Sequence, residues 1–327
     1  MFQISKTTLK TKQCLSRSDH KVSTNTPKHL WCWDIITGLL LWLGVIEEPE
    51  DPLILTIKRG VYCMNCEEYS KAELILHSAL QMSQDMASES AEIYVLDVLA
   101  NNYFKSGDYK KAEQLFAVVF NRVLGKGMQS NDESIIEMSV KLSHIYSTSG
   151  ETEKSEIGFD FCLTEQTKRV ESFRDKSCDD MSPEEMNSMA LLGMCYDYYG
   201  KHLSSLGRFD RAIDSLNKAI DICVKINGST HPQTLVLYND LSAIYVHKKD
   251  YQKAVMYLKK AIDGAVLTED KNLAKYYLNI GFIHLLRFEK DLALNSCRQS
   301  LSLALQTSKD KTIEGMARKC MIDAGSQ

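Results

Sequence analysis

The stretch Ala72-Glu-Leu-Ile-Leu-His-Ser-Ala79 combines a small residue, a large residue four positions later and a small residue three positions further on. The same spacing returns five times, at residues 112–119, 155–162, 212–219, 254–261 and, most weakly, 293–300. Successive first positions are separated by 40, 43, 57, 42 and 39 residues. On a helix, small residues permit close approach of a neighbouring helix, and the large residue fills the remaining gap. The chain therefore contains about six tandem repeats of packed helices.

A second pattern precedes most of these stretches and completes each repeat as a pair of helices. A large residue, a small one and an aromatic residue occur at Leu99-Ala100-x2-Tyr103, Leu142-Ser143-x2-Tyr146 and Leu241-Ser242-x2-Tyr245. The two patterns together resemble the A- and B-helices of the tetratricopeptide repeat (TPR). We expect an all-α, right-handed superhelical solenoid of about six TPR helix pairs, several at about 42-residue spacing. It should occupy residues 51–305, with a C-terminal tail or capping helix at 306–327.

Local signals mark where helices begin. Asp51-Pro52 and Ser182-Pro183-Glu184-Glu185 each place a capping side chain before a proline in the first helical turn. Glu185 also completes a capping box. The 57-residue interval contains a charged stretch, Glu165 to Asp180, which we interpret as a solvated helix extension and loop.

The N-terminal 33 residues have the composition of a targeting sequence. Residues 1–33 contain six Lys or Arg, nine Ser or Thr and a single acidic residue, Asp19. A basic, hydroxyl-rich and acid-poor segment is typical of a mitochondrial transit peptide. A disordered cytosolic tail is the alternative.

A short apolar, membrane-proximal segment is expected at residues 34–50. Its uninterrupted part, Ile35 to Ile46, is shorter than the roughly 20 residues of a membrane-spanning helix. All three tryptophans lie in or beside it, and tryptophan favours membrane interfaces. This favours shallow attachment, with a full span and a soluble capping helix as the alternatives.

Charge and cysteine usage restrict the class of protein. The leader holds six of the 39 basic residues and one of the 43 acidic residues, so the remainder has 33 basic and 42 acidic residues. No basic field exists to neutralise phosphates, which argues against nucleic-acid binding.

The ten cysteines lack the spacing of a disulfide scaffold, and we interpret them as small apolar residues in a reducing compartment. Cys63 and Cys66 form a lone CxxC, interpreted as part of the helix-turn region of the first repeat, with a metal or redox site as the alternatives.

No motif builds a catalytic, metal or cofactor site. Gly125-Lys126-Gly127 lacks the strand and glycine spacing of a phosphate loop. The eight histidines are scattered without a pair at metal-ligand spacing, and five lie on separate predicted helices: His77, His144, His202, His247 and His284. We therefore expect a protein that is not an enzyme, uses no cofactor or metal and takes no small-molecule substrate. Helical solenoids more commonly bind other proteins.

A partner-binding groove is expected on the concave face, which the A-helices line in such solenoids. Counting from each repeat pattern predicts eight groove side chains: Asp97, Asn101, Glu137, His144, Asp197, Lys201, Asn239 and Lys275. Asn101 and Asn239 are suited to bind the backbone of an extended peptide, because an amide both donates and accepts hydrogen bonds. The alternative is that these amides are solvated or bonded to neighbouring helices.

Several segments resemble one particular family beyond the general repeat. These are KAELILHSAL (71–80), KAEQLFAVVFNRVLGKGM (111–128), IIEMSVKLSHIYS (135–147), LLGMCYDYYGKHL (191–203) and HPQTLVLYNDLS (231–242). They are similar to the mitochondrial tetratricopeptide repeat protein 19 family over about residues 38–305. The resemblance implies a mitochondrial inner-membrane protein, matrix-facing or peripheral, that supports assembly or maintenance of respiratory complex III. Its implied partners are complex III subunits, including the Rieske iron–sulfur protein whose fragments it helps to clear.

A second family shares part of this pattern. Kinesin light chains have repeats of similar length and a similar His-Pro-x-Thr helix start, which corresponds to residues 231–234 here. The alternative function is therefore a cytosolic adaptor that binds cargo peptides. The chain lacks an upstream heptad coiled coil, which argues against a motor subunit.

Overall fold

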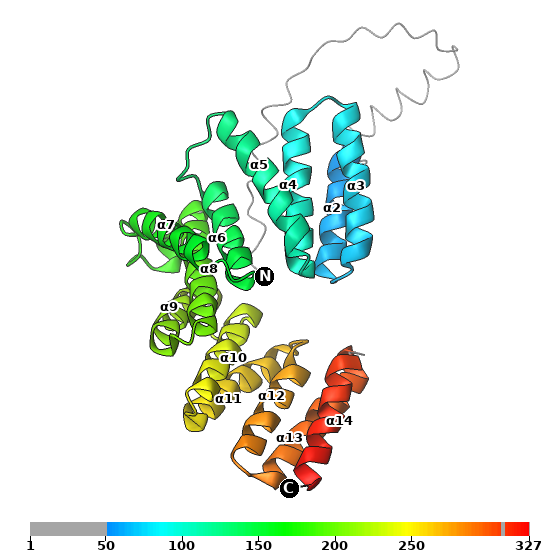
Figure 1. The fold of residues 1–327 in the computed structure, drawn as a ribbon, viewed down its shortest axis with the longest axis vertical. Helices are drawn as coiled ribbons and strands as arrows, with labels where there is room; N and C mark the ends of the chain where they lie inside the picture. The colour runs from blue at the N-terminus through cyan, green and yellow to red at the C-terminus, as the bar shows by residue number, and fades with distance from the viewer. Residues whose placement is uncertain (1–50, 309–310, 327) are drawn as a thin grey trace, which may run out of the picture. The chain divides into compact units, whose positions relative to one another are not determined.

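The computed structural model describes residues 51–308 and 311–326, and in these ranges it contains thirteen α-helices and no strand (Figure 1). The described chain divides into two compact units, residues 51–128 and residues 129–326. Within each unit every helix packs against the next one along the chain. The predictions for residues 1–33 and 34–50 lie outside the described residues.

The helices form the six predicted pairs, each with an A-helix followed by a B-helix. Residues 51–128 form α2 (Pro52–Asn65), α3 (Tyr69–Asp85), α4 (Glu89–Ser106) and α5 (Tyr109–Gly125). Residues 129–326 form α6 (Glu133–Thr148), α7 (Thr152–Val170), α8 (Pro183–Ser205), α9 (Phe209–Asn227), α10 (Pro232–His247), α11 (Tyr251–Thr268), α12 (Leu273–Leu286), α13 (Lys290–Leu303) and α14 (Lys311–Ser326). The predicted all-α solenoid of TPR pairs is confirmed.

The B-helix pattern marks the core of every repeat. All eighteen residues at the small, large and small positions of the six repeats are at most 2% exposed. The sixth repeat, whose pattern is weakest, buries Ala293, Cys297 and Ser300 completely. Where serine replaces alanine its hydroxyl is satisfied, since Ser300 Oγ donates to the Ala274 carbonyl at 2.8 Å. We call the first small residue of each pattern the repeat's first anchor.

Each A-helix carries a small residue at the position that, in the first, fourth and sixth repeats, lies against the large residue of the B-helix. This residue stands twelve positions before the first anchor: Gly60, Ala100, Ser143, Gly200, Ser242 and Gly281. A Cβ atom added to Gly60 would lie 2.6 Å from Leu76 Cδ2, closer than van der Waals contact allows. The corresponding Cβ at Gly200 would lie 3.0 Å from Leu216 Cγ. The two helices of a pair therefore meet at the same position in the first, fourth and sixth repeats.

The turn between the two helices of a pair has one geometry throughout. The residue five positions before the first anchor has a positive φ in all six repeats: Glu67 (62°), Gly107 (83°), Gly150 (83°), Gly207 (71°), Lys249 (60°) and Phe288 (59°). In five repeats the next residue donates its N–H to a carbonyl five positions earlier, as Asp250 does to Tyr245 at 2.9 Å. This left-handed turn ends the A-helix and satisfies its last carbonyls.

A lysine on the B-helix covers the tyrosine of the A-helix in three repeats. The Nζ atoms of these lysines lie 4.6 to 5.3 Å from the ring centroids, in the pairs Lys111–Tyr103, Lys154–Tyr146 and Lys253–Tyr245. Each lysine immediately precedes the first anchor. A cation over an aromatic face contributes about 0.5–1 kcal/mol at such exposed sites, so these contacts reinforce the pairing of the two helices.

The predicted helix starts are present, but the segment before α8 is not wholly solvated. Asp51 Oδ1 accepts from the N–H of Leu53 at 2.8 Å, and Ser182 with Glu185 forms the complete capping box. The charged residues from 174 to 176 are exposed, yet Phe173 and Met181 are buried against α7 and α8. The prediction of a solvated stretch from Glu165 to Asp180 is wrong at Gln166, Val170 and Phe173, which are buried. Phe173, together with Met181 just beyond the stretch, anchors an otherwise polar connection.

The C-terminal end corrects the interpretation of the cysteines. Helix α14 packs on α12 and α13, and Cys320 on α14 forms a disulfide with Cys297 on α13. The expectation that the cysteines are unpaired is wrong for this pair. The physical reason is that α14 covers the large-residue position of the sixth repeat, with the two Cα atoms 6.1 Å apart. Among the described residues, six cysteines are free, including Cys63 and Cys66 of the CxxC pair.

We predict that Gly60→Ala lowers the free energy of unfolding by about 1–3 kcal/mol, because the new methyl group meets the buried Leu76 side chain. Unfolding followed by circular dichroism in urea measures the change. The matched control is Gly315→Ala in α14, where an added Cβ has no neighbour within 4 Å. That control should stabilise the protein by up to about 1 kcal/mol through helix propensity. Equal effects of the two substitutions would contradict the packing argument.

Candidate interaction surface

The predicted groove residues of the first unit lie on α4. Asp97 and Asn101 are one helical turn apart and both are half-buried. Asn101 Nδ2 donates to the backbone carbonyl of Asp97 at 2.8 Å. One amide hydrogen of Asn101 is therefore bonded to the backbone of its own helix, and this bond orients the side chain.

In the second unit, α6 carries Glu137 and His144. Glu137 is exposed, and its carboxylate accepts a hydrogen bond of 2.6 Å from Nζ of Lys141, which is buried. His144 is half-buried, and its ring centroid lies 4.7 Å from that of Tyr198 on α8. The His144–Tyr198 contact therefore joins two successive A-helices.

Lys201 on α8 is the centre of a charged cluster. Its ammonium lies 3.0 Å from the carboxylate of Asp197, one turn earlier, and 3.2 Å from Asp240 on α10. The same ammonium lies 5.6 Å from the Tyr198 ring centroid. Asp197 is buried, whereas Lys201 and Asp240 are half-buried. The cluster links α8 to α10 and contacts the aromatic pair that links α8 to α6.

A pair of amides continues these contacts to α12. Asn279 Nδ2 on α12 donates to Asn239 Oδ1 on α10 at 2.7 Å, and Asn239 Nδ2 donates to Asp240 Oδ1 at 3.2 Å. Asn239 is buried and Asn279 is half-buried. The sequence suggested that Asn239 binds a peptide backbone, with bonding to a neighbouring helix as the alternative. The structure shows the second arrangement, because Asn239 bonds to Asn279 on α12. Lys275 is exposed on α12 and makes no ion pair with a described residue.

These contacts form a continuous band of polar side chains across four A-helices, which we call the A-helix row: His144, Tyr198, Asp197, Lys201, Asp240, Asn239 and Asn279. Sequence reasoning missed Tyr198, Asp240 and Asn279. All three stand fourteen positions before their first anchor, as does Lys141 in the preceding repeat. Polar or phenolic side chains at one offset in four consecutive repeats are the signal that identifies them.

Burial and charge control the protonation of the row. Burial raises the pKa of the Asp197 carboxyl above its usual value, although Lys201 opposes this. Burial disfavours the charged form of Lys201, but the carboxylates of Asp197 and Asp240 outweigh it and raise the ammonium pKa. Burial and the nearby Lys201 lower the pKa of His144 from 6.5 to about 4. At neutral pH the row therefore presents a neutral imidazole beside a charged lysine.

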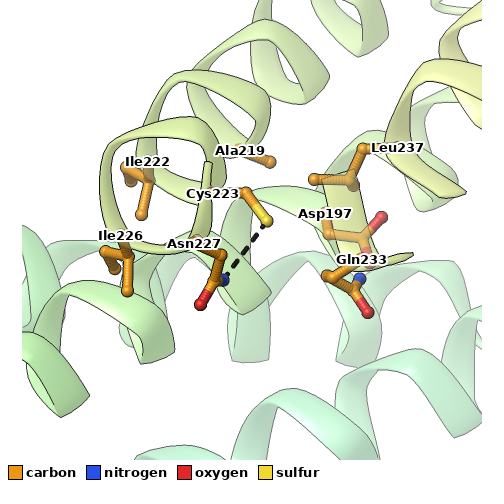
Figure 2. A pocket seen from close by; sticks show the side chains of 9 residues that line it. Asp197, Ala219, Ile222, Cys223, Ile226, Asn227, Gln233 and Leu237 are labelled. Atoms are coloured by element: carbon orange, nitrogen blue, oxygen red, sulfur yellow. Dashed lines mark hydrogen bonds between the residues drawn. The ribbon is translucent and has the colours of Figure 1, made fainter. Parts of the chain in front are cut away.

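Two hollows lie near the row in the second unit. Figure 2 shows the first, whose walls include Asp197 of α8, Cys223 of α9 and Leu237 of α10. Its volume of about 10 Å³ is that of a single water molecule. The second is an open depression of about 400 Å³ beside Tyr238 and Tyr257, where Lys260 Nζ lies 5.6 and 5.3 Å from the two ring centroids.

Residues 51–308 and 311–326 contain no group of three or more His, Cys, Asp or Glu side chains arranged to hold a metal ion. In the same ranges, no helix is both long and apolar enough to span a lipid bilayer.

The repeats also match known sequences and structures. The sequence model of the tetratricopeptide-repeat family matches residues 196–265. A Rap protein crystallised with competence and sporulation factor superposes with a TM-score of 0.59 at 13% identity, covering 89% of this chain and 79% of that one. That likeness concerns the fold alone. The chain is thus a tetratricopeptide-repeat protein.

Sequence relatives narrow this class to one family. Tetratricopeptide repeat protein 19, mitochondrial, of Rattus norvegicus is 34% identical over 219 residues, covering 67% of this chain and 60% of the relative. The Drosophila melanogaster homolog of the same mitochondrial protein is 29% identical over 295 residues, covering 89% and 77% of the two chains. The chain belongs to the tetratricopeptide repeat protein 19 family. It spans about 60% of the length of the rat relative that it matches.

We predict that His144 makes stability depend on pH between about 6.5 and 4. Its folded-state pKa of about 4 lies below the ordinary 6.5, so the unfolded chain binds a proton that the folded chain excludes. The stabilisation is complete above pH 6.5 and is lost as the pH falls toward 4. His144→Gln should flatten the curve of unfolding free energy against pH by about 1–2 kcal/mol over this range. His247→Gln, which removes an imidazole at an exposed position of α10, is the control.

A second prediction concerns Lys201. Lys201→Met removes the ammonium between Asp197 and Asp240, leaving a buried carboxyl without its partner, and should cost about 3 kcal/mol of unfolding free energy. Adding Asp197→Asn should recover part of this loss, because the uncompensated charge is then absent. Chemical unfolding of the single and double variants tests the coupling. If the double variant loses as much unfolding free energy as the two single variants lose together, Lys201 and Asp197 do not interact. Lys259→Met, at an exposed position of α11, is the control.

Proposed function

We propose that this protein is a non-enzymatic interaction factor of mitochondria that supports assembly and maintenance of respiratory complex III at the inner membrane. Its role would include handling the Rieske iron–sulfur subunit and clearing its fragments. Membership of the tetratricopeptide repeat protein 19 family carries the proposal. The mitochondrial names of the rat and fly relatives favour this compartment over that of a cytosolic adaptor.

The A-helix row is the surface proposed to receive a partner segment. It presents donors and acceptors from Lys201, Asp240 and Asn279 side by side. An extended segment offers a backbone N–H and carbonyl at each residue, which amide and carboxylate side chains can bind without demanding one sequence. Exposed Lys275 on α12 and Glu137 on α6 add opposite charges on two of the same helices. This arrangement favours a polar, extended partner segment over a small molecule.

Deleting the gene in cells that normally express it tests the proposed role. We expect lower complex III activity and an accumulation of Rieske-derived fragments, measured by cytochrome c reduction and by immunoblotting. A copy of the chain with a C-terminal fluorescent tag should restore both readouts and locate to mitochondria. Normal complex III activity together with normal Rieske fragment levels would contradict the proposal, as would a wholly cytosolic tag.

Charge reversal tests whether the A-helices provide the binding surface. Lys275→Glu changes an exposed α12 residue and should reduce co-purification of complex III subunits with the tagged chain several-fold. Lys259→Glu makes the same change at an exposed position of the B-helix α11 and should leave co-purification unchanged. Equal losses for the two variants would assign the effect to overall charge and not to the A-helix face.

A further inference from the structure

The first A-helix, α2, exposes two positions that four other A-helices bury. These positions stand seventeen and ten residues before the first anchor, and on α2 they are Leu55 and Tyr62. Leu55 is 38% exposed and Tyr62 is 70% exposed. In the four A-helices that follow a B-helix of the same unit, the equivalent side chains are at most 3% exposed: Val95, Asn102, Cys195, His202, Leu237, Ile244, Tyr276 and Ile283. We call Leu55 and Tyr62 the α2 face.

The preceding B-helix covers these positions in the other repeats. Asn102 Nδ2 on α4 donates to the carbonyl of Tyr69, the first residue of α3, at 3.2 Å. The ring centroid of His202 on α8 lies 5.4 Å from that of Phe159 on α7, and Cys195 belongs to the same buried cluster as Phe159. Helix α10 packs on α9 and α12 packs on α11 in the same order. The repeat geometry therefore identifies what covers such a face, namely the chain segment just before the A-helix.

The α2 face lacks the composition of a solvated end. A terminal repeat that faces water needs a polar outer surface, whereas Leu55 and Tyr62 are apolar or largely so. Arg59 lies between them on the helix, and its aliphatic stem can extend the apolar surface while its charge stays in water. At the other end of the chain, α14 covers the last helix pair and buries Ala317 and Cys320. The chain thus already uses an additional segment to close one terminal pair.

The uncharged stretch from Ile35 to Ile46 has the position and the length to cover the α2 face. Five residues, 47–51, separate it from α2. The four comparable connections from a B-helix to the next A-helix contain three, twelve, four and four residues. Leu55 and Tyr62 are about two helical turns apart, or about 10 Å along the helix axis. A twelve-residue stretch on a five-residue connection can therefore reach both side chains.

The charges beside this stretch favour a protein surface over a lipid surface. Residues 47–51 are Glu-Glu-Pro-Glu-Asp, so four of the five are acidic. An anionic membrane attracts lysine and arginine next to an apolar anchor and repels carboxylates. The stretch is also shorter than the roughly 20 residues of a membrane-spanning helix. The sequence alone favoured shallow membrane attachment, and the exposed α2 face instead supports the alternative of a soluble cap.

We propose that the stretch from Ile35 to Ile46 packs against Leu55 and Tyr62 and closes the first repeat, as a B-helix closes each of the four comparable repeats. The inference goes beyond the proposed function and does not depend on it. The apolar side chains of the stretch are then used within the chain, and contacts with other proteins hold the protein at a membrane. Burial of the stretch and of the α2 face removes apolar area of both from water.

Tryptophan fluorescence tests this contact directly, because all three tryptophans lie at positions 31, 33 and 42. Trp31→Phe and Trp33→Phe in the full chain leave Trp42 as a single reporter inside the stretch. We expect a blue-shifted emission, and several-fold weaker quenching by acrylamide than in the same chain unfolded in urea. Leu55→Glu or Tyr62→Glu should remove this protection. Leu74→Glu changes an equally exposed apolar side chain on α3 and should preserve it.

The outcomes distinguish the possible occupants of the α2 face. Unchanged far-UV circular dichroism should accompany Leu55→Glu and Tyr62→Glu, since both side chains are exposed without the stretch. A Trp42 that is as accessible in the folded chain as in urea overturns the inference, as does protection that both glutamate variants retain. Protection that appears only at high protein concentration overturns it in favour of a second copy of the chain. Quenching of Trp42 by vesicles of brominated phosphatidylcholine and cardiolipin overturns it in favour of a lipid surface.

Discussion

The close contact between a small A-helix residue and a large B-helix residue is the constraint on which each repeat depends. Gly60 meets Leu76 and Gly200 meets Leu216 at distances that leave no room for a Cβ atom without displacement of the leucine. This contact brings the two helices of a pair close together and determines where along their length they meet. Gly281 preserves it in the sixth repeat, where Cys297 takes the large position and α14 covers it. The fold therefore tolerates a change of the large side chain more easily than enlargement of the small one.

The A-helix row follows from this helix spacing. Because successive pairs stack with similar geometry, a side chain eleven positions before one first anchor comes close to the side chain fourteen positions before the next. His144 thus lies beside Tyr198, and Lys201 beside Asp240. Buried polar groups require partners, and the row supplies them across helices: two carboxylates for Lys201 and an amide for Asn239. An ion pair broken on one side leaves an uncompensated charge, so the row is a structural link between repeats.

Sequence reasoning succeeded where the information was local to one repeat. Helix starts, turns and the buried anchors depend on residues within about forty positions of one another, and each of them has a recurrent signal. It failed where two elements had to be placed against each other. The Cys297–Cys320 bond depends on how α14 folds back, and the burial of Phe173 and Met181 depends on the approach of α7 to α8. The row partners Tyr198, Asp240 and Asn279 were missed because the offset between neighbouring A-helices was unknown.

A repeated backbone also provides an internal comparison of side chains in one geometry. The eighteen buried small, large and small positions of the B-helices vary little. In contrast, the position eleven residues before the first anchor differs in five successive repeats: Asn101, His144, Lys201, Ala243 and Phe282. The positive-φ turn shows the same contrast, since glycine, lysine and phenylalanine occupy it in turn. Packing therefore restricts one set of positions and leaves another set to present different chemistry. A solenoid can acquire a binding surface at the second set without changing its core, because each repeat contacts only its neighbours.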